Sequence, residues 1–278
     1  MRTPVDGGDQ IAVKMLRPNK LSSSSAVRDL EFEMHLMSRI SHRHVLRCLG
    51  TSLPEEPPDR KFLALATISS TLADVLPPPP LPDGSSTLAR MHAVKRWPLS
   101  RAFKLALELS TALRYLHDVC FSNFMVLHRD IKPKNLGLMP SDGRLVVFDF
   151  GISKLLRRKQ GTTLKDGVKL TGLCGSLRYM APEVASCQPY NHKSEIYSFA
   201  IVFWQMLALQ RPYDTITAEA FEEVVCKKQV RPKVNEKKWP SAVCTLLNRC
   251  WHPDPAMRPE TCEVVDEMMA IVAAGHMK

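Results

Sequence analysis

A run of prolines divides the sequence and limits what the residues around it can form. Residues 77–86 read Pro-Pro-Pro-Pro-Leu-Pro-Asp-Gly-Ser-Ser. Proline has no backbone N–H, and glycine and serine favour turns, so this stretch cannot form a helix or an interior strand. We interpret it as a spacer or insertion. Its Pro-x-x-Pro pattern also allows residues 77–82 to bind a partner's aromatic-lined groove, which is the alternative use.

The residues on the two sides of this break differ in periodicity. Before it, Gln10 to Leu16 and Phe62 to Ile68 are apolar stretches of strand length, and Val27 to Ile40 has helical spacing. From Ser100 onward the pattern is mainly helical, with an apolar stripe that runs towards His117. The sequence therefore predicts an α+β protein in which a small, partly β lobe precedes a large, mainly helical lobe.

Composition is that of an ordinary folded protein. The chain has 278 residues, of which 45% are hydrophobic and 24% charged. Its eight cysteines form no C-x-x-C pair, which indicates reduced thiols rather than a zinc site or a disulfide framework. The start of the sequence lacks the apolar core of a signal peptide, so we expect a cytoplasmic, intracellular protein.

Two classes of partner are not expected. The longest apolar run, Ile196 to Leu209, is shorter than the roughly 20 residues that span a bilayer, so we predict a buried helix and no membrane segment. The net charge of +10 favours anionic partners in general. No basic stripe interleaved with aromatic residues accompanies that charge, so nucleic acid is not expected.

The strongest chemical signal is the segment His128-Arg129-Asp130-Ile131-Lys132-Pro133-Lys134-Asn135. It places an acid, a cation and an amide close together on a predicted loop. A carboxylate can accept the proton of an attacking hydroxyl, a lysine can neutralise charge on a γ-phosphoryl group, and an amide oxygen can bind Mg²⁺. A polar turn with accidental spacing is the alternative.

Asp149-Phe150-Gly151 follows fourteen residues after Asn135. This carboxylate could hold Mg²⁺ between phosphate oxygens. The tripeptide is weak by itself, because an aspartate at the end of a strand is commonly a turn residue. Its distance from the preceding loop is what makes it informative.

A third segment, Gly175 to Glu183, supplies a turn, a hydroxyl and an acid, and Arg258 is the candidate partner of that acid. With these residues the chain resembles the eukaryotic protein kinases, and their tyrosine-kinase-like group in particular, from Ile11 to about Ile271. The resemblance implies the bilobal kinase fold. It predicts an incomplete N-lobe with hinge at 1–70, a hinge exit with the proline-rich insertion at 71–100, and a C-lobe at 101–278.

The resemblance also implies roles for residues of the small lobe. Lys14, in Ile11-Ala12-Val13-Lys14, would bind the α- and β-phosphates of ATP, and Ala12 would line the adenine pocket. Glu33 is the expected partner of Lys14, and Glu31 is the weaker candidate. Taken alone, Lys14 would be read as an exposed strand lysine.

In the large lobe the resemblance makes Asp130 the catalytic base and Lys132 the γ-phosphate contact, with Asn135 and Asp149 as Mg²⁺ ligands. His128, Phe150 and Met37 would stack in the hydrophobic core of an active conformation. The Asp-x-Lys-Pro-x-x-Asn pattern and Ser176 are typical of kinases that phosphorylate serine or threonine in proteins.

Three departures from the family's pattern bear on function. No glycine-rich phosphate loop precedes Lys14, which predicts that the N-lobe is truncated. Gly137 stands where an apolar residue usually forms the floor of the adenine site, so a roomier pocket is expected. Glu195 replaces the usual aspartate that braces the catalytic loop, and its extra methylene could shift that loop.

These departures keep two alternatives open, a pseudokinase or scaffold without turnover and a small-molecule phosphotransferase. The first conflicts with the retained Lys14, Asp130 and Asp149, and the second with the peptide-positioning segment at 175–183. The basic segment between Asp149 and Glu183 carries Thr162, Thr163 and Thr171. Phosphate on one of them could order that segment by pairing with its cations and with Arg129, although a solvated basic loop is an equal interpretation.

Overall fold

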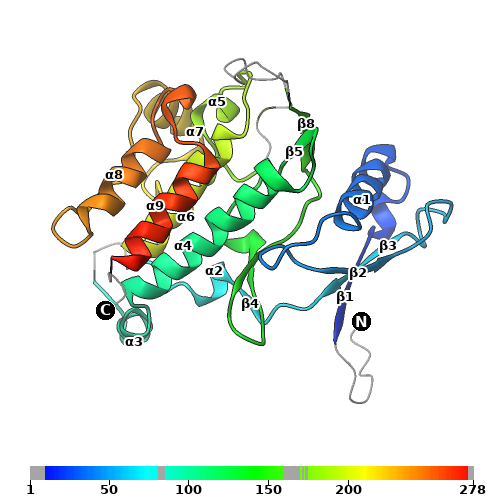
Figure 1. The fold of residues 1–278 in the computed structure, drawn as a ribbon, viewed down its shortest axis with the longest axis horizontal. Coiled ribbons are helices and arrows are strands. Elements are labelled where there is room, and N and C mark those ends of the chain that lie inside the picture. Colours follow the sequence, from blue (N-terminus) through cyan, green and yellow to red (C-terminus); the bar gives the residue numbers. More distant parts are fainter. Residues whose placement is uncertain (1–9, 81–84, 159–169, 171, 173–174, 275–278) are drawn as a thin grey trace.

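The computed structural model describes residues 10–80, 85–158, 170, 172 and 175–274. Two lobes lie side by side, and the chain passes between them near β4 (Figure 1). Helices and strands are both present, strand-rich in the first lobe and mainly helical in the second, which confirms the predicted α+β class. None of the helices in this described part is long and apolar enough to cross a membrane.

The described part of the small lobe contains an antiparallel sheet and one α-helix. The strands follow the order β1-β3-β2. The elements are β1 (Ile11–Met15), α1 (Ser24–Met37), β2 (Cys48–Thr51) and β3 (Phe62–Ala66). Strand β1 is an edge in this sheet, and its alternate residues Ile11, Val13 and Met15 are 56%, 53% and 49% exposed. The intervening Lys14 therefore points to the opposite face, as the two-residue period of a strand requires.

Helix α1 starts and ends earlier than the apolar spacing predicted. Ser23 is the N-cap, and its side chain accepts a hydrogen bond from the backbone N–H of Ala26 at 3.4 Å. Leu30, Glu33 and Met37 are buried on the face that packs inward. Glu33 is thus a carboxylate within an apolar stripe, which brings it to the interior of the small lobe.

The large lobe is built mainly from helices, with short strands at its junction with the small lobe. Strands β4, β6 and β7 form one antiparallel sheet, and β5 pairs with β8. Its first elements are β4 (Ser70–Thr71), α2 (Leu72–Val75), α3 (Leu88–Lys95), α4 (Leu99–Arg114), β5 (Phe124–Leu127), β6 (Leu136–Leu138), β7 (Leu145–Val147) and β8 (Lys154–Arg157). Its later elements are α5 (Pro182–Ala185), α6 (Lys193–Ala208), α7 (Ala218–Phe221), α8 (Ser241–Cys250) and α9 (Thr261–Ala273).

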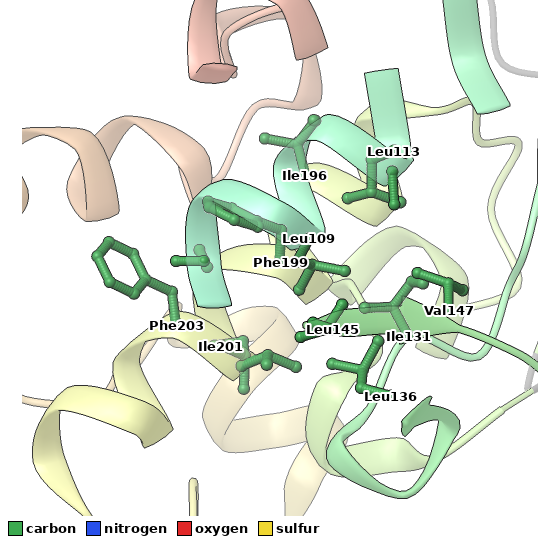
Figure 2. Close-up of a cluster of buried hydrophobic side chains, with 14 of the residues drawn as sticks. Leu109, Leu113, Ile131, Leu136, Leu145, Val147, Ile196, Phe199, Ile201 and Phe203 are labelled. Carbon is green, nitrogen blue, oxygen red and sulfur yellow. The ribbon is translucent and has the colours of Figure 1, made fainter. Parts of the chain in front are cut away.

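The core of the large lobe packs against the segment that contains the candidate base Asp130. Figure 2 shows Leu109 and Leu113 of α4 beside Ile196 and Phe199 of α6. Ile131, from the segment that carries the candidate base, is 2% exposed and belongs to the same cluster. The loop around Asp130 is therefore held from below by buried apolar contacts.

The proline-rich segment is attached to its own domain. Pro77 is buried, and the carbonyl of Pro78 accepts a hydrogen bond from the Arg90 guanidinium. The same guanidinium donates to the carbonyl of Leu209, at the end of α6, at 3.1 Å. Arg90 lies on α3, a helix that the sequence pattern did not predict.

Candidate active site

Lys14 joins two carboxylates that come from different lobes. Its Nζ lies 2.7 Å from Oε2 of Glu33 and 2.7 Å from Oδ1 of Asp149. The predicted pairing of Lys14 with Glu33 is therefore present. The weaker candidate Glu31 faces Lys61 instead, at 3.1 Å.

Glu33 and Asp149 differ in their surroundings. Glu33 is 2% exposed and also accepts a hydrogen bond from the backbone N–H of Phe150 at 3.1 Å. The Asp149 side chain is 46% exposed. Burial alone would raise the pKa of the Asp149 carboxyl, but the hydrogen bond and charge of Lys14 hold it below its ordinary value. Asp149 is consequently an ionised oxygen donor that solvent and a ligand can reach.

The Asp130 carboxylate is fixed on one side and free on the other. Its Oδ2 accepts from Lys132 Nζ at 2.5 Å and from Asn135 Nδ2 at 2.9 Å. Its Oδ1 is buried and has no hydrogen-bond partner within the residues that the structure describes. A buried acceptor left unpaired is costly, so this atom is a place where a hydroxyl donor would be stabilised.

Gly175 lies close to the free Oδ1 of Asp130. Its φ is +100°, and a Cβ added there would lie 2.6 Å from the carbonyl oxygen of Arg129 and 3.1 Å from Asp130 Oδ1. Only glycine fits this position. Its neighbour Ser176 lies in a groove that leads away from Asp130.

Glu195 braces the backbone just before Asp130. Its Oε1 accepts from the backbone N–H of Arg129 at 2.6 Å, and its Oε2 lies 2.6 Å from Nε2 of His117. His117 also contacts Thr261 Oγ1 at 2.9 Å. Burial would raise the pKa of the Glu195 carboxyl, but the hydrogen bond with His117 holds it below its ordinary value. The longer side chain thus keeps its contact with the loop, and the sequence pattern missed the part played by His117.

The rings of His128 and Phe150 contact each other and connect the segment around Asp130 with the segment around Asp149. The His128 ring donates from Nε2 to the carbonyl of Phe148 at 3.0 Å and accepts at Nδ1 from the backbone N–H of Asp130 at 3.2 Å. Its ring meets that of Phe150 edge-on, with centroids 4.8 Å apart. Met37 is 2% exposed and belongs to the same hydrophobic core.

The expected roomier pocket at Gly137 is wrong. A Cβ added to Gly137 would lie 2.6 Å from Cγ2 of Ile68, so Ile68 already fills the space of the missing side chain. Ile68 follows β3, far from Gly137 in sequence, and nothing in the local pattern marks it. Glycine at 137 and isoleucine at 68 therefore compensate each other in volume.

The segment that ends at Glu183 is anchored as predicted. Arg258 donates to both carboxylate oxygens of Glu183, at 2.6 and 2.9 Å, and the arginine side chain is fully buried. Thr162, Thr163 and Thr171, the predicted phosphorylation positions, lie outside the described residues.

The oxygen ligands that Asn135 and Asp149 offer suit a hard cation that takes its other ligands from water and phosphate. Asn135 donates from its amide nitrogen to the backbone carbonyl and the carboxylate of Asp130, which leaves its amide oxygen as an acceptor. Across the residues that the structure describes, no group of three or more His, Cys, Asp or Glu side chains could hold a metal alone. Mg²⁺ is typically bound through one or two protein oxygens plus water and phosphate oxygens, so these residues fit it.

The arrangement is that of a protein phosphotransferase: a lysine held by two acids above a loop with a free carboxylate oxygen, and an anchored segment beside it. The protein kinase domain family matches residues 3–269, and the chain belongs to this family. Members of the family use ATP and typically Mg²⁺.

Curated relatives extend this finding. The Arabidopsis thaliana serine/threonine-protein kinase 12 is 30% identical over 273 residues, which cover 98% of this chain and 54% of the relative. Serine/threonine-protein kinase STY17 of Arabidopsis thaliana is 28% identical over 95% of this chain and 40% of its own length. Dual specificity protein kinase shkE of Dictyostelium discoideum is 28% identical over 95% of this chain and 34% of its own length. The chain thus spans about half or less of each of these proteins.

Proposed function

We propose that this chain transfers the γ-phosphoryl group of ATP to serine or threonine hydroxyls of proteins. The observation that carries the proposal is the buried Oδ1 of Asp130, which has no hydrogen-bond partner in the described part of the chain and lies on the loop that holds Lys132 and Asn135. A hydroxyl hydrogen-bonded to that oxygen would be oriented for attack.

Each residue would then act on a named atom. The acceptor oxygen bonds to the γ-phosphorus as the bond to the β-bridging oxygen breaks, and Asp130 Oδ1 takes the hydroxyl proton. Lys132, 2.5 Å from Asp130 Oδ2, would neutralise charge on the transferred group. Lys14, oriented by Glu33, would bind the α- and β-phosphates, with Ala12 beside the adenine.

Mg²⁺, when bound, would neutralise the phosphate oxygens of ATP. Asp149 and the amide oxygen of Asn135 are the residues we assign to it. Asp149 is half-exposed and its pKa is lowered chiefly through Lys14, against the effect of burial, so it offers a charged oxygen at neutral pH.

We also place the protein in the cytoplasm. The cysteines of the described residues are all free thiols, Cys48, Cys120, Cys187, Cys226, Cys244, Cys250 and Cys262, in keeping with a reducing compartment.

The test is phosphoryl transfer from radiolabelled ATP with Mg²⁺ to generic acceptor proteins, followed by phosphoamino-acid analysis. Asp149→Ala should abolish transfer, and Asp130→Asn should lower the rate by about 10²–10⁴ while nucleotide still binds. An undiminished rate in Asp130→Asn would remove this residue from its role. Phosphotyrosine in the product would refute the restriction to serine and threonine.

A further inference from the structure

A groove of about 600 Å³ runs along the large lobe from the candidate active site. Lys132, whose Nζ contacts Asp130, lines it, and so does Ser176. Leu209 at the end of α6 and Phe221 of α7 line it as well. An extended segment lying in this groove would pass Lys132, which contacts Asp130.

The described lining residues carry charge of one sign. They include Lys132, Lys134, Arg178 and Arg211, and they include no aspartate or glutamate. Lys134 and Arg211 are exposed. Burial raises the pKa of Tyr179 to about 12, and the charges of Arg211 and Arg178 oppose this rise. The Arg178 guanidinium donates to the backbone carbonyls of Pro212 and Tyr213, so Lys134 and Arg211 are the cations exposed to a ligand.

Three carboxylates lie beside these cations: Asp130 contacts Lys132, Asp74 is close enough to Lys134 for their charges to interact, and Asp214 faces Arg211. Asp74 accepts from the backbone N–H and the hydroxyl of Thr71, at 2.8 and 2.7 Å, and caps α2. Asp214 faces Arg211 at 3.8 Å, in a pair whose side chains are both more than half exposed. An exposed pair of this kind is weak, so a carboxylate of a bound segment can compete with Asp214 for Arg211.

The proline-rich segment forms one wall of this groove. Pro77, Pro78 and Pro79 line it, and Arg90 holds the carbonyl of Pro78 in place. A wall of prolines offers few N–H donors, because proline has none. The charge of this groove therefore comes from its lysines and arginines and not from residues 77–79.

Resting on the function proposed above, we infer that this groove selects acceptor segments with acidic side chains next to the phosphorylated serine or threonine. Carboxylates of such a segment would pair with Lys134 and Arg211 while the acceptor hydroxyl reaches Asp130. In this arrangement residues 77–79 are part of the substrate site rather than a ligand for another protein.

The experiment compares two serine peptides that differ only in flanking residues, glutamate in one and lysine in the other. Using the 278-residue chain, we expect kcat/KM to be about tenfold higher for the glutamate peptide at low salt, and the difference to shrink as salt is added. The double variant Lys134→Glu, Arg211→Glu should bring the ratio to one or below. Lys237→Glu, an exposed lysine that does not line the groove, is the matched control and should keep the ratio of the parent.

Peptide binding separates this inference from the proposed function. A labelled glutamate peptide with alanine at the acceptor position should bind more tightly than its lysine counterpart, and Lys134→Gln should weaken that binding. If the chain transfers no phosphate but binds in this order, the catalytic proposal fails and the groove assignment stands. Equal use of both peptides, or equal binding, would overturn the groove assignment, and so would a lysine preference.

Discussion

Two carboxylate–cation clusters in this kinase domain use the same chemical groups for different purposes. In the cluster between the lobes, the side chains of Lys14 and Asp149 are 38% and 46% exposed. In the cluster of the large lobe, Arg258 is fully buried and Glu183 is 11% exposed. In the first cluster Lys14 and Asp149 can exchange partners with a ligand at little cost and only Glu33 is buried. In the second cluster the loss of either partner leaves the other charge buried.

The hydrogen bonds of the two clusters differ in the same way. Arg258 binds both oxygens of Glu183 and also donates to the carbonyls of His252 and Lys193, at 2.9 and 3.0 Å. Lys14 divides its Nζ between two acids that belong to different lobes. The buried pair therefore fixes the segment before α5, while the half-exposed cluster links the lobes and stays open to phosphate.

The largest expected effect comes from breaking the buried pair. Arg258→Met should lower the free energy of unfolding by about 3–5 kcal/mol, because it leaves Glu183 without its partner in a dry site. Urea unfolding of the two proteins measures the difference. Arg249→Met is the control: its side chain is 41% exposed beside Glu267, and its loss should cost less than about 1 kcal/mol. An Arg258→Met protein as stable as the parent would contradict the contrast drawn here.

Breaking the inter-lobe cluster should change stability less and ligand binding more. Lys14→Met should cost about 1–3 kcal/mol, because the buried Glu33 loses its cation but keeps the Phe150 N–H, while the half-exposed Asp149 is solvated. The same variant should lose the rise in melting temperature that ATP with Mg²⁺ gives to the parent. Thermal melts with and without nucleotide check both points. A loss of stability equal to that of Arg258→Met would show that the two clusters do not differ as proposed.

The smallest effect concerns a cluster of intermediate exposure. Glu260 is 52% exposed and lies 2.7 Å from His192 Nε2 and 2.7 Å from Lys193 Nζ. The hydrogen bond with His192 is the largest cause that lowers the pKa of Glu260 to about 2, against burial, which would raise it. A carboxyl pKa that is lowered in the folded protein stabilises the fold at pH values above the ordinary value of 4.5. That contribution is lost as the pH falls towards 2.

The difference in unfolding free energy between the parent and Glu260→Gln should therefore be below about 1 kcal/mol at pH 7 and shrink between pH 5 and pH 2. Glu236→Gln, an exposed acid outside this cluster, should show no such change. A difference that grew on acidification would have the wrong sign for this assignment.

Much of the fold was readable from local pattern. The apolar stripes gave helices α1, α4 and α6 within a few residues of their bounds, and β1 and β3 fall inside the predicted strands. The spacing of Asp130, Asn135 and Asp149 likewise pointed to one site. These features depend on residues close in sequence, whose contacts follow from the periods of helix and strand.

Features that depend on packing were not readable in the same way. Helix α3 has few buried residues, so its sequence carries no strong stripe. Glu195 contacts both Arg129 and His117 only because elements distant in sequence pack together. The same packing forms the positive groove.

The sequence by itself determined the lobes, the segment around Asp130 and the candidate pair Glu183 with Arg258, and its resemblance to the protein kinases added the pair Lys14 with Glu33. Tertiary structure alone decided that Ile68 fills the space at Gly137 and that residues 77–79 wall a groove beside Asp130. The physical reason is close packing: a space in the interior is filled by any side chain that can reach it. That side chain can come from a distant part of the chain.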